Sequence, residues 1–151
     1  SHIKQQLTNL KRELKMGNRA VLAFVNDEGK KDKNSVGIYL HWNGGRDSVE
    51  GFLQTAKDYE LRSGSYGVAR LTQIIANGLG GTLSLGVDLL KNLDCDNYDN
   101  GVYWIDQNFN IVDREYINRP DFKEQQQYSL TSFVRRLKQD NDKFFKANPL
   151  R

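Results

Sequence analysis

Two stretches of apolar residues near the start of the chain predict a pair of β-strands. They are residues 19–27, RAVLAFVND, and residues 35–43, SVGIYLHWN, both rich in β-branched and apolar side chains. A short polar loop joins them, which favours an antiparallel hairpin. Residues 101–106 and 109–117, GVYWID and FNIVDREYI, predict a second hairpin with a tight turn between them.

Helical spacing of apolar residues predicts three helices in the rest of the domain. The first begins with a capping-box-like pair, Asp47 and Glu50, the second ends at Gly80-Gly81, and the third lies near the C-terminus. Residues 82–93, TLSLGVDLLKNL, fit either a strand or a helical turn. The apolar positions of the three helices are Val49, Phe52, Leu53 and Ala56; Val68, Leu71, Ile75 and Leu79; and Leu130, Phe133, Val134, Leu137, Asn141 and Phe144.

A further amphipathic helix is predicted at the N-terminus, over residues 1–16. Ile3, Leu7, Leu10 and Leu14 recur at intervals of four, three and four, which places them on one helical face, and a glycine ends the helix. A helix of this length is marginal on its own, so the stripe must pack on the domain or on a partner. Pairing with the same stripe of a second copy would make a homodimer, although about two heptads are short for a coiled coil.

Together these elements predict an α+β fold, in which an antiparallel β-sheet of two hairpins is packed against several helices. The 151 residues are expected to form a single domain, long enough to bury a core without disulfides or metals. Within it we expect a peripheral helix at 1–16, a central core at 17–117 and a basic helix within 121–151.

The composition is that of a water-soluble domain. Hydrophobic residues make up 38% and charged residues 27%, mean hydropathy is −0.70, and no apolar run approaches the roughly 20 residues needed to span a membrane. The first residues lack the apolar core of a signal peptide. Cys95 is the single cysteine, so no intrachain disulfide can form, and we expect a reducing, cytoplasmic location.

Lysine and arginine gather in separate segments, although the net charge is only +3. Lys30, Lys31 and Lys33 lie in the polar loop after the first strand, and Arg135 and Arg136 lie on the last predicted helix. If these residues share one face, they would form a surface that binds nucleic acid. The alternative, which we favour, is that they are the solvated sides of amphipathic elements.

The turn after the second strand holds the side chains with the richest chemistry. Alternation places the even-numbered positions from Val36 to Trp42 toward the core, and Tyr39 and His41 on the opposite face. The sequence Asn43-Gly44-Gly45, which follows Trp42, permits a sharp turn because glycine accepts positive φ. Two interpretations remain open: a site for a phosphate or a nucleobase, and a structural turn that starts a helix, which we favour. The candidate binding residues are Tyr39, His41, Trp42, Asn43 and Arg46.

Metal and covalent chemistry find little support in the sequence. The acidic segment from Asp94 to Asn100 lacks the ligand spacing of an EF-hand and is typical of an Asn/Asp-rich turn. A Cys95–His41 dyad has no supporting local sequence, and the nucleophile-elbow and Walker A patterns are missing. We therefore expect no metal, no cofactor and no enzyme activity, with a small phosphorylated ligand near His41 as a third hypothesis.

Four sequence blocks carry a resemblance that covers roughly residues 17–117: GNRAVLAF, GIYLHWNGGRDSVEGFL, YGVARLTQIIANGLGGTLSLGV and DNGVYWID…IVDRE. Their order resembles that of a family of small proteins encoded by bacteria, prophages and mobile elements. The resemblance brings no activity with it, and so it transfers no catalytic residue. It implies a protein that binds and blocks host machinery.

The leading hypothesis is thus a non-enzymatic binding protein of a phage or mobile element, an inhibitor of a bacterial defence system such as an anti-CRISPR protein. Its partner would be a host protein or ribonucleoprotein, with a CRISPR effector as the first example. The second hypothesis is a small nucleic-acid-binding protein that uses the basic helices. Its binding would weaken steeply with salt, because counterion release drives such binding.

Overall fold

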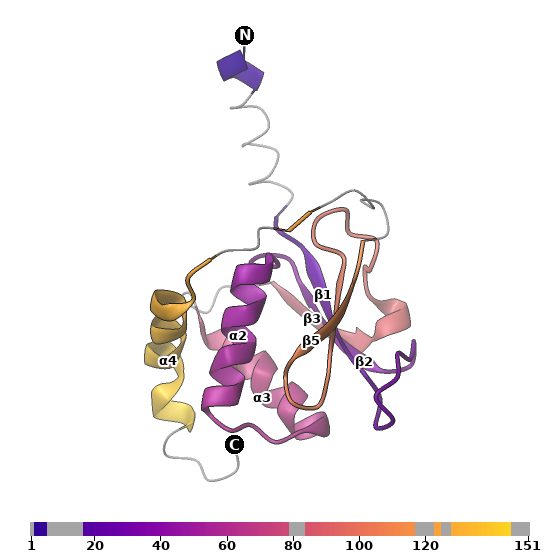
Figure 1. Ribbon diagram of the computed structural model, residues 1–151, viewed down its shortest axis with the longest axis vertical. Helices are drawn as coiled ribbons and strands as arrows, with labels where there is room; N and C mark the ends of the chain where they lie inside the picture. Colours follow the sequence, from indigo (N-terminus) through magenta and orange to yellow (C-terminus); the bar gives the residue numbers. More distant parts are fainter. Residues whose placement is uncertain (1, 6–16, 79–83, 117–122, 125–127, 146–151) are drawn as a thin grey trace.

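A computed structural model describes residues 2–5, 17–78, 84–116, 123–124 and 128–145. These residues form a five-stranded sheet that helices cover on one face (Figure 1). The strands are β1 (Ala20–Phe24), β2 (Val36–Leu40), β3 (Leu85–Leu89), β4 (Val102–Ile105) and β5 (Ile111–Glu115), in the order β3-β2-β1-β4-β5 across the sheet. The predicted α+β fold is confirmed.

Both predicted hairpins are present in the sheet. Ala20 of β1 lies opposite Leu40 of β2, and β4 pairs antiparallel with β5, with a register shift next to Trp104. The ambiguous segment 82–93 contains β3, which pairs antiparallel with β2. It continues into a short 3-10 helix, η2 (Leu90–Asn92).

One pairing departs from the predicted antiparallel sheet. β1 and β4 run parallel, with Val21 opposite Val102. The chain between them forms β2, α2, α3 and β3 before it reaches β4. Parallel neighbours require a long connection of this kind, whereas a hairpin needs only a tight turn. As a result β1 lies at the centre of the sheet, and the carboxyl ends of β1 and β4 meet at the same end of it.

Three helices pack on one face of the sheet and on one another: α2 (Arg46–Asp58), α3 (Gly64–Asn77) and α4 (Thr131–Phe145). Their apolar sides close the larger core over the side chains that the strands direct toward them. Each large side chain that is fully buried contributes about 1.5–3 kcal/mol. Prominent members of this core are Leu22, Ile38, Leu40, Tyr103 and Ile105 from the strands, and Phe52, Leu53, Leu71, Ile75 and Leu137 from the helices.

The opposite face carries a smaller core, which explains why β1 is apolar at every position. A central strand that is buried on both faces shows a continuous apolar run instead of alternation. The segment around η2 covers this side of the sheet. The smaller core contains Val21, Ala23, Val25, Leu90, Val102 and Trp104, with Tyr39, Leu93 and Cys95 packed against it.

The predicted core face of β2 is right at its centre and wrong at its ends. Ile38 and Leu40 are buried, whereas Val36 is exposed and Trp42 is half-buried. The helices cover the middle of the strand, while Val36 lies at the end of the sheet and Trp42 lies beyond the last paired residue. Alternation therefore gave the correct face but not the extent of burial.

The buried stripe of α4 ends one residue later than predicted. Leu137 and Asn141 are buried as expected, but Phe145 completes the stripe and Phe144 is exposed. The reason is that the ring of Phe145 stacks on that of Tyr59, at a centroid distance of 4.9 Å. This contact fixes the last turn of α4 against the end of α2.

Residues 2–5 are helical, and Ile3 is exposed. The other positions of the predicted dimer stripe, Leu7, Leu10 and Leu14, lie outside the described residues, as does the predicted stop at Gly80-Gly81. The homodimer therefore stays a prediction. Among the helices of the described residues, none combines the length and the apolar character required to cross a membrane.

Candidate functional site

Tyr39, His41 and Trp42 form a connected aromatic cluster where β2 ends. The Tyr39 hydroxyl and His41 Nδ1 are 2.9 Å apart, and the imidazole meets the Trp42 ring edge-on at a centroid distance of 5.2 Å. The backbone of His41 is also held on both sides. Its backbone N–H donates to the Ser84 carbonyl at 3.1 Å, and its backbone carbonyl accepts from the Asn18 backbone N–H at 2.8 Å. Burial raises the pKa of Tyr39, so its hydroxyl remains protonated at neutral pH.

The sequence predicted that a glycine adopts the positive φ in the turn at Asn43-Gly44-Gly45, but in the structure Asn43 does so. Asn43 has a φ of 59°, and neither glycine has a positive φ. Gly44 is required by close approach instead, because a Cβ there would lie 2.5 Å from the Asn18 carbonyl oxygen. The Gly44 carbonyl accepts from the Tyr103 hydroxyl at 2.6 Å. This turn is a structural junction between β1, β4 and α2.

α2 begins at Arg46 without the predicted capping box. Its N-cap is Gly45, which has no side chain to accept a hydrogen bond. Asp47 lies inside the helix and accepts from the Ser48 N–H at 2.8 Å, while Glu50 pairs with Arg46 at 3.3 Å. A capping box needs a side-chain oxygen at the N-cap itself, so the prediction placed the helix start too late.

Arg46 belongs to a different cluster from His41. Its guanidinium pairs with Glu124 at 2.8 Å, and Glu124 also pairs with Arg114. In the described parts of the chain, no hydrogen bond or ion pair joins Arg46 to Tyr39 or His41. The three side chains are therefore not linked directly to one another, and a phosphate site that includes all of them stays a prediction.

Arg114 is a buried charge that the sequence analysis missed. Its side chain is 9% exposed. The guanidinium carbon lies 3.5 Å from the centre of the Tyr103 ring and 4.7 Å from that of Tyr116, and Nη2 donates to the Asn100 carbonyl at 2.7 Å. Burial lowers the pKa of Arg114, although arginine stays charged in proteins. The sequence of β5, IVDRE, has the polar residues of an exposed strand, so the burial of the Arg114 side chain becomes visible only in the folded structure.

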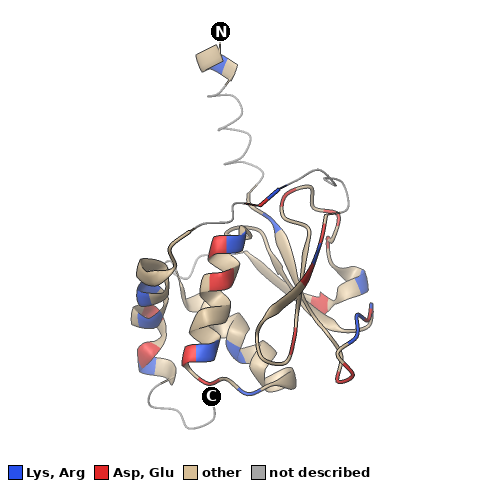
Figure 2. Cartoon of the chain, in the orientation of Figure 1, with Lys and Arg blue, Asp and Glu red and all other residues tan. Residues whose placement is uncertain are grey.

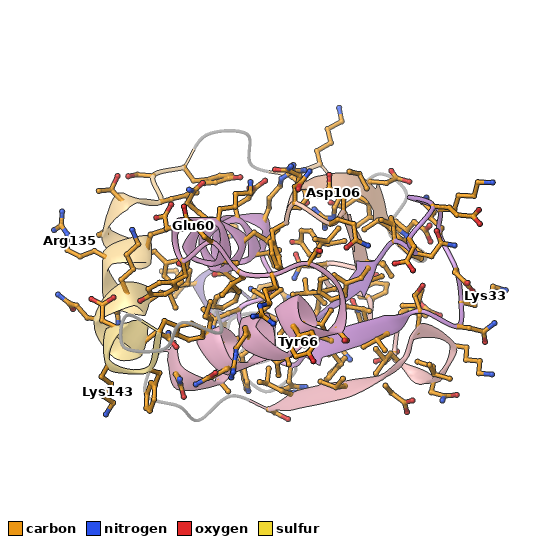
Figure 3. All side chains as sticks on the ribbon, turned by 90° about the horizontal axis from the view of Figure 1, so that it is seen from below. Lys33, Glu60, Tyr66, Asp106, Arg135 and Lys143 are labelled. Atoms are coloured by element: carbon orange, nitrogen blue, oxygen red, sulfur yellow. The ribbon has the colours of Figure 1, made fainter. Side chains whose placement is uncertain are left out.

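The candidate nucleic-acid-binding residues lie at two opposite ends of the molecule. Lys33 marks the loop between β1 and β2 at one end, and Arg135 marks α4 at the other (Figure 3). Acidic residues are interspersed with the basic ones on α2 and α4 (Figure 2). The fold therefore does not bring Lys30, Lys31 and Lys33 onto one face with Arg135 and Arg136.

The loop lysines are partly engaged within the molecule. Lys31 pairs with Asp113 and, at 3.0 Å, with Glu115, and its ammonium lies 5.6 Å from the centre of the Trp104 ring. Trp104 Nε1 donates to the same Glu115 carboxylate at 2.8 Å. These contacts hold the loop against β4 and β5, on the sheet face opposite the three helices. Lys30 lies 3.7 Å from Glu28, while Lys33, Arg135 and Arg136 are exposed.

The predicted Asn/Asp-rich turn before β4 is a closely hydrogen-bonded loop. The buried Asn97 side chain donates to the carbonyls of Asp94 and Gly101 at 3.0 and 3.2 Å, and it accepts from the N–H groups of Asp99 and Gly101 at 3.2 and 3.0 Å. Asp99 pairs with Arg19 at 2.7 Å, and this hydrogen bond raises the pKa of Arg19. Among the described residues, no group of three or more His, Cys, Asp or Glu side chains is placed to hold a metal.

A cavity of about 590 Å³ opens at the end of the sheet, beside the first half of α3. We call it the sheet-end cavity. Its apolar lining includes two valines that remain 40% and 54% exposed, Val36 and Val87. This volume is within the range of sites that hold small molecules or short chain segments. The main apolar lining residues are Phe24, Val36, Val68, Val87, Ile105 and Phe109.

The charged residues of the cavity lining are two aspartates, Asp27 and Asp106. They follow β1 and β4, whose carboxyl ends meet because the pair is parallel, with Phe24 opposite Ile105. Neither aspartate was a candidate in the sequence analysis, since an all-antiparallel sheet gave no reason to place them together. The available signal was an aspartate soon after each apolar run: Asp27 follows Val25 and Asn26, and Asp106 directly follows Ile105.

Cys95 is half-buried and packs against the smaller core. Burial raises the pKa of its thiol, and Sγ lies 3.7 Å from the Leu90 carbonyl oxygen. A reactive cysteine needs a lowered pKa, because the thiolate is the nucleophile. The environment of Cys95 has the opposite effect.

Comparison of the chain with protein-family profiles, with curated proteins and with solved structures gives no match. Function is therefore inferred from the geometry of the molecule itself.

Proposed function

We propose that the protein is a non-enzymatic binding protein that holds part of a partner protein in the sheet-end cavity. The observation that carries this proposal is the apolar floor of the cavity, where Val36 and Val87 remain exposed. Covering such surface with a partner is favourable by about 25 cal/mol per Å² of apolar area. An apolar hollow with a few polar groups at its mouth is typical of a recognition site.

The side chains with the greatest catalytic potential are engaged in internal contacts elsewhere. His41 is bonded to Tyr39, and Arg46 and Arg114 share Glu124. These residues do not belong to the lining of the sheet-end cavity. The groups that the cavity offers to a partner are apolar side chains, small hydroxyls, the Gln107 amide and two carboxylates, which supports recognition over nucleophilic chemistry.

The resemblance to proteins of bacteria, prophages and mobile elements supplies the setting of the proposal. In that setting the partner is a host protein or ribonucleoprotein, and binding inhibits a bacterial defence system. A CRISPR effector is the first partner to test.

The test is affinity capture from a bacterial lysate that contains a CRISPR effector, with and without nuclease, read by mass spectrometry. Three baits are compared: the wild type, Val87→Lys and Val112→Lys. Val112 is a matched control, because it is 53% exposed on the opposite edge strand, β5, and does not line the cavity. Circular dichroism melting first establishes that all three baits are folded.

We expect the wild type and Val112→Lys to capture the same protein in both nuclease conditions, and Val87→Lys to lose it. Equal capture by all three baits would exclude the sheet-end cavity as the binding site. Loss of the captured material on nuclease treatment would replace the proposal with nucleic-acid binding.

A further inference from the structure

We infer that the sheet-end cavity holds an extended segment of the partner protein in which apolar side chains are flanked by lysine or arginine. This inference rests on the proposed function and specifies the chemistry of the partner. It draws on the charge of the cavity mouth and on the dimensions of the floor.

The charge of the mouth is opposite to that of the whole chain. The net charge is +3, yet the charged residues that line the cavity, Asp27 and Asp106, are both acidic. Asp106 Oδ1 accepts from the N–H groups of Asn108 and Asn110, both at 2.9 Å, which fixes this carboxylate on its turn. Two carboxylates beside an apolar floor, one of them held by these hydrogen bonds, favour a cationic group on the occupant and disfavour an anionic one.

Three cations near the mouth have other partners: Lys30 lies 3.7 Å from Glu28, Lys31 pairs with Asp113 and Glu115, and Arg62 contacts Tyr66. Arg62, which precedes α3, has its guanidinium 5.4 Å from the centre of the Tyr66 ring. Tyr66 is exposed next to the cavity-lining residue Ser65, and Figure 3 views this end of the molecule with Tyr66 and Asp106 labelled. An arginine held over an aromatic ring leaves the acidic side of the mouth available to a partner.

The dimensions of the floor favour a chain segment over a small molecule. Its residues come from four neighbouring strands: Val87 on β3, Val36 on β2, Phe24 on β1 and Ile105 on β4. Neighbouring strands lie about 4.8 Å apart, so the floor spans about 14 Å, the length of about four extended residues. Because β3 is an edge strand of the described sheet, the floor reaches the side of the molecule, where a partner chain has access.

The experiment uses the full chain and a displayed library of random nine-residue peptides. The library is panned on the wild type and counter-selected on Val87→Lys, so that peptides are retained only if they need the cavity floor. We expect the retained peptides to be enriched in apolar residues together with lysine or arginine, and depleted in aspartate and glutamate.

A second step tests the two carboxylates with a matched control. Asp27→Asn/Asp106→Asn is compared with Glu28→Gln/Asp32→Asn, which changes the net charge equally on residues outside the cavity lining. Asparagine at 106 retains the oxygen that accepts from Asn108 and Asn110. We expect the first variant to weaken binding of the selected peptides about three- to tenfold at low salt, and the second to change it less than about twofold.

The outcomes separate this inference from the proposed function. No peptide that distinguishes the wild type from Val87→Lys means that the cavity does not bind protein segments, and both fall. If the cavity-dependent peptides lack basic residues, the charge inference is overturned and the proposed function stands. The same holds if the peptides bind both double variants with equal affinity. Analytical ultracentrifugation tests whether a second copy of the chain is the occupant. If the wild type self-associates and Val87→Lys abolishes this association, the inference of a partner-protein segment is overturned.

Discussion

At the scale of single residues, a few polar side chains join elements that are distant in sequence. Tyr103 is the clearest case: its hydroxyl donates to the Gly44 carbonyl at 2.6 Å, and its ring lies 3.5 Å from the Arg114 guanidinium carbon. Burial raises the pKa of Tyr103, so the hydroxyl remains a donor. This one residue connects β4, β5 and the turn that starts α2.

Replacing Tyr103 with phenylalanine is expected to lower the free energy of unfolding by about 1–3 kcal/mol, because the buried Gly44 carbonyl loses its donor. Urea denaturation followed by tryptophan fluorescence measures the change. Tyr66→Phe is the control, since Tyr66 is exposed, and it should change the stability by less than about 0.5 kcal/mol. Equal effects of the two substitutions would contradict a role for the Tyr103 hydroxyl.

Asp113 provides a prediction about pH. Hydrogen bonds from Lys31 and from the Arg114 N–H lower the pKa of its carboxyl. A carboxyl with a lowered folded-state pKa stabilises the fold above its unfolded value of about 3.9, and this contribution is lost as the pH falls through the folded-state pKa. Lys31→Met removes one donor, so we expect the pKa of Asp113 to rise.

Carbon-detected NMR titration of the Asp113 carboxyl measures that shift directly. Lys33→Met is the matched control, because Lys33 is an exposed lysine of the same loop, and it should leave the titration unchanged. A titration of Asp113 that is the same in Lys31→Met and in the wild type would show that the ion pair does not persist in solution.

At the scale of elements, α4 is joined to α3 by a polar contact within an otherwise apolar stripe. Asn141 is fully buried, and its side-chain amide donates to the carbonyls of Leu137 at 2.9 Å and Ile74 at 3.3 Å. Its oxygen accepts from the Asn77 amide at 3.0 Å. Helical period placed Asn141 on the correct face, while only the packed structure shows what it bonds.

Asn141→Ala is expected to lower the free energy of unfolding by about 1–3 kcal/mol, because the part-buried Asn77 amide loses its acceptor and the Ile74 carbonyl, which keeps the Gly78 N–H, loses a second donor. Gln139→Ala, at an exposed position of the same helix, should cost less than about 0.5 kcal/mol. Thermal and urea unfolding measure both. An Asn141→Ala protein as stable as the control would mean that water replaces these bonds.

The elements themselves could be predicted from the sequence far better than their partners. Both hairpins followed from short loops between apolar runs, because local chain geometry decides such pairings. The parallel pairing of Val21 with Val102 depends on where the chain goes between the two strands, and local patterns do not encode that path. The helix starts were also inexact, since the turn before α2 relies on close packing at Gly44 and not on a side-chain cap.

The candidate sites divide in the same way. The contact between Tyr39 and His41 could be predicted, because residues two apart on a strand share a face. Arg46 was grouped with them by sequence proximity, but it is the first residue of a helix and pairs with Glu124. The sheet-end cavity could not be predicted, because five separate elements and their loops contribute its lining.

At the scale of the whole molecule, the separation of the basic clusters sets how the chain meets nucleic acid. Five cations on one face would give a slope of about −4.5 for log affinity against log salt with duplex DNA. Because the loop lysines and the α4 arginines lie at opposite ends (Figure 3), we expect a slope no steeper than about −2.7, the value for the three lysines alone. Fluorescence anisotropy with a labelled duplex over a range of salt concentrations measures it.

Two alanine variants test whether the clusters act separately. One replaces Lys30, Lys31 and Lys33, and the other replaces Arg135 and Arg136. Each is expected to weaken the residual binding independently, so that the effects add. A slope near −4.5 that both variants reduce together would show that one DNA molecule contacts both clusters, contrary to this expectation.

The parallel pairing of β1 with β4 also governs how the chain can fold as it leaves the ribosome. β1 is synthesised before the other strands of this sheet, but its neighbour on one side lies roughly 80 positions later, a long-range contact of the kind that slows folding. Until β4 emerges, the nascent chain presents a strand that is apolar on both faces and has one unpaired edge, which is a site for aggregation. Termination of synthesis before Ile105 would therefore leave the centre of the sheet incomplete.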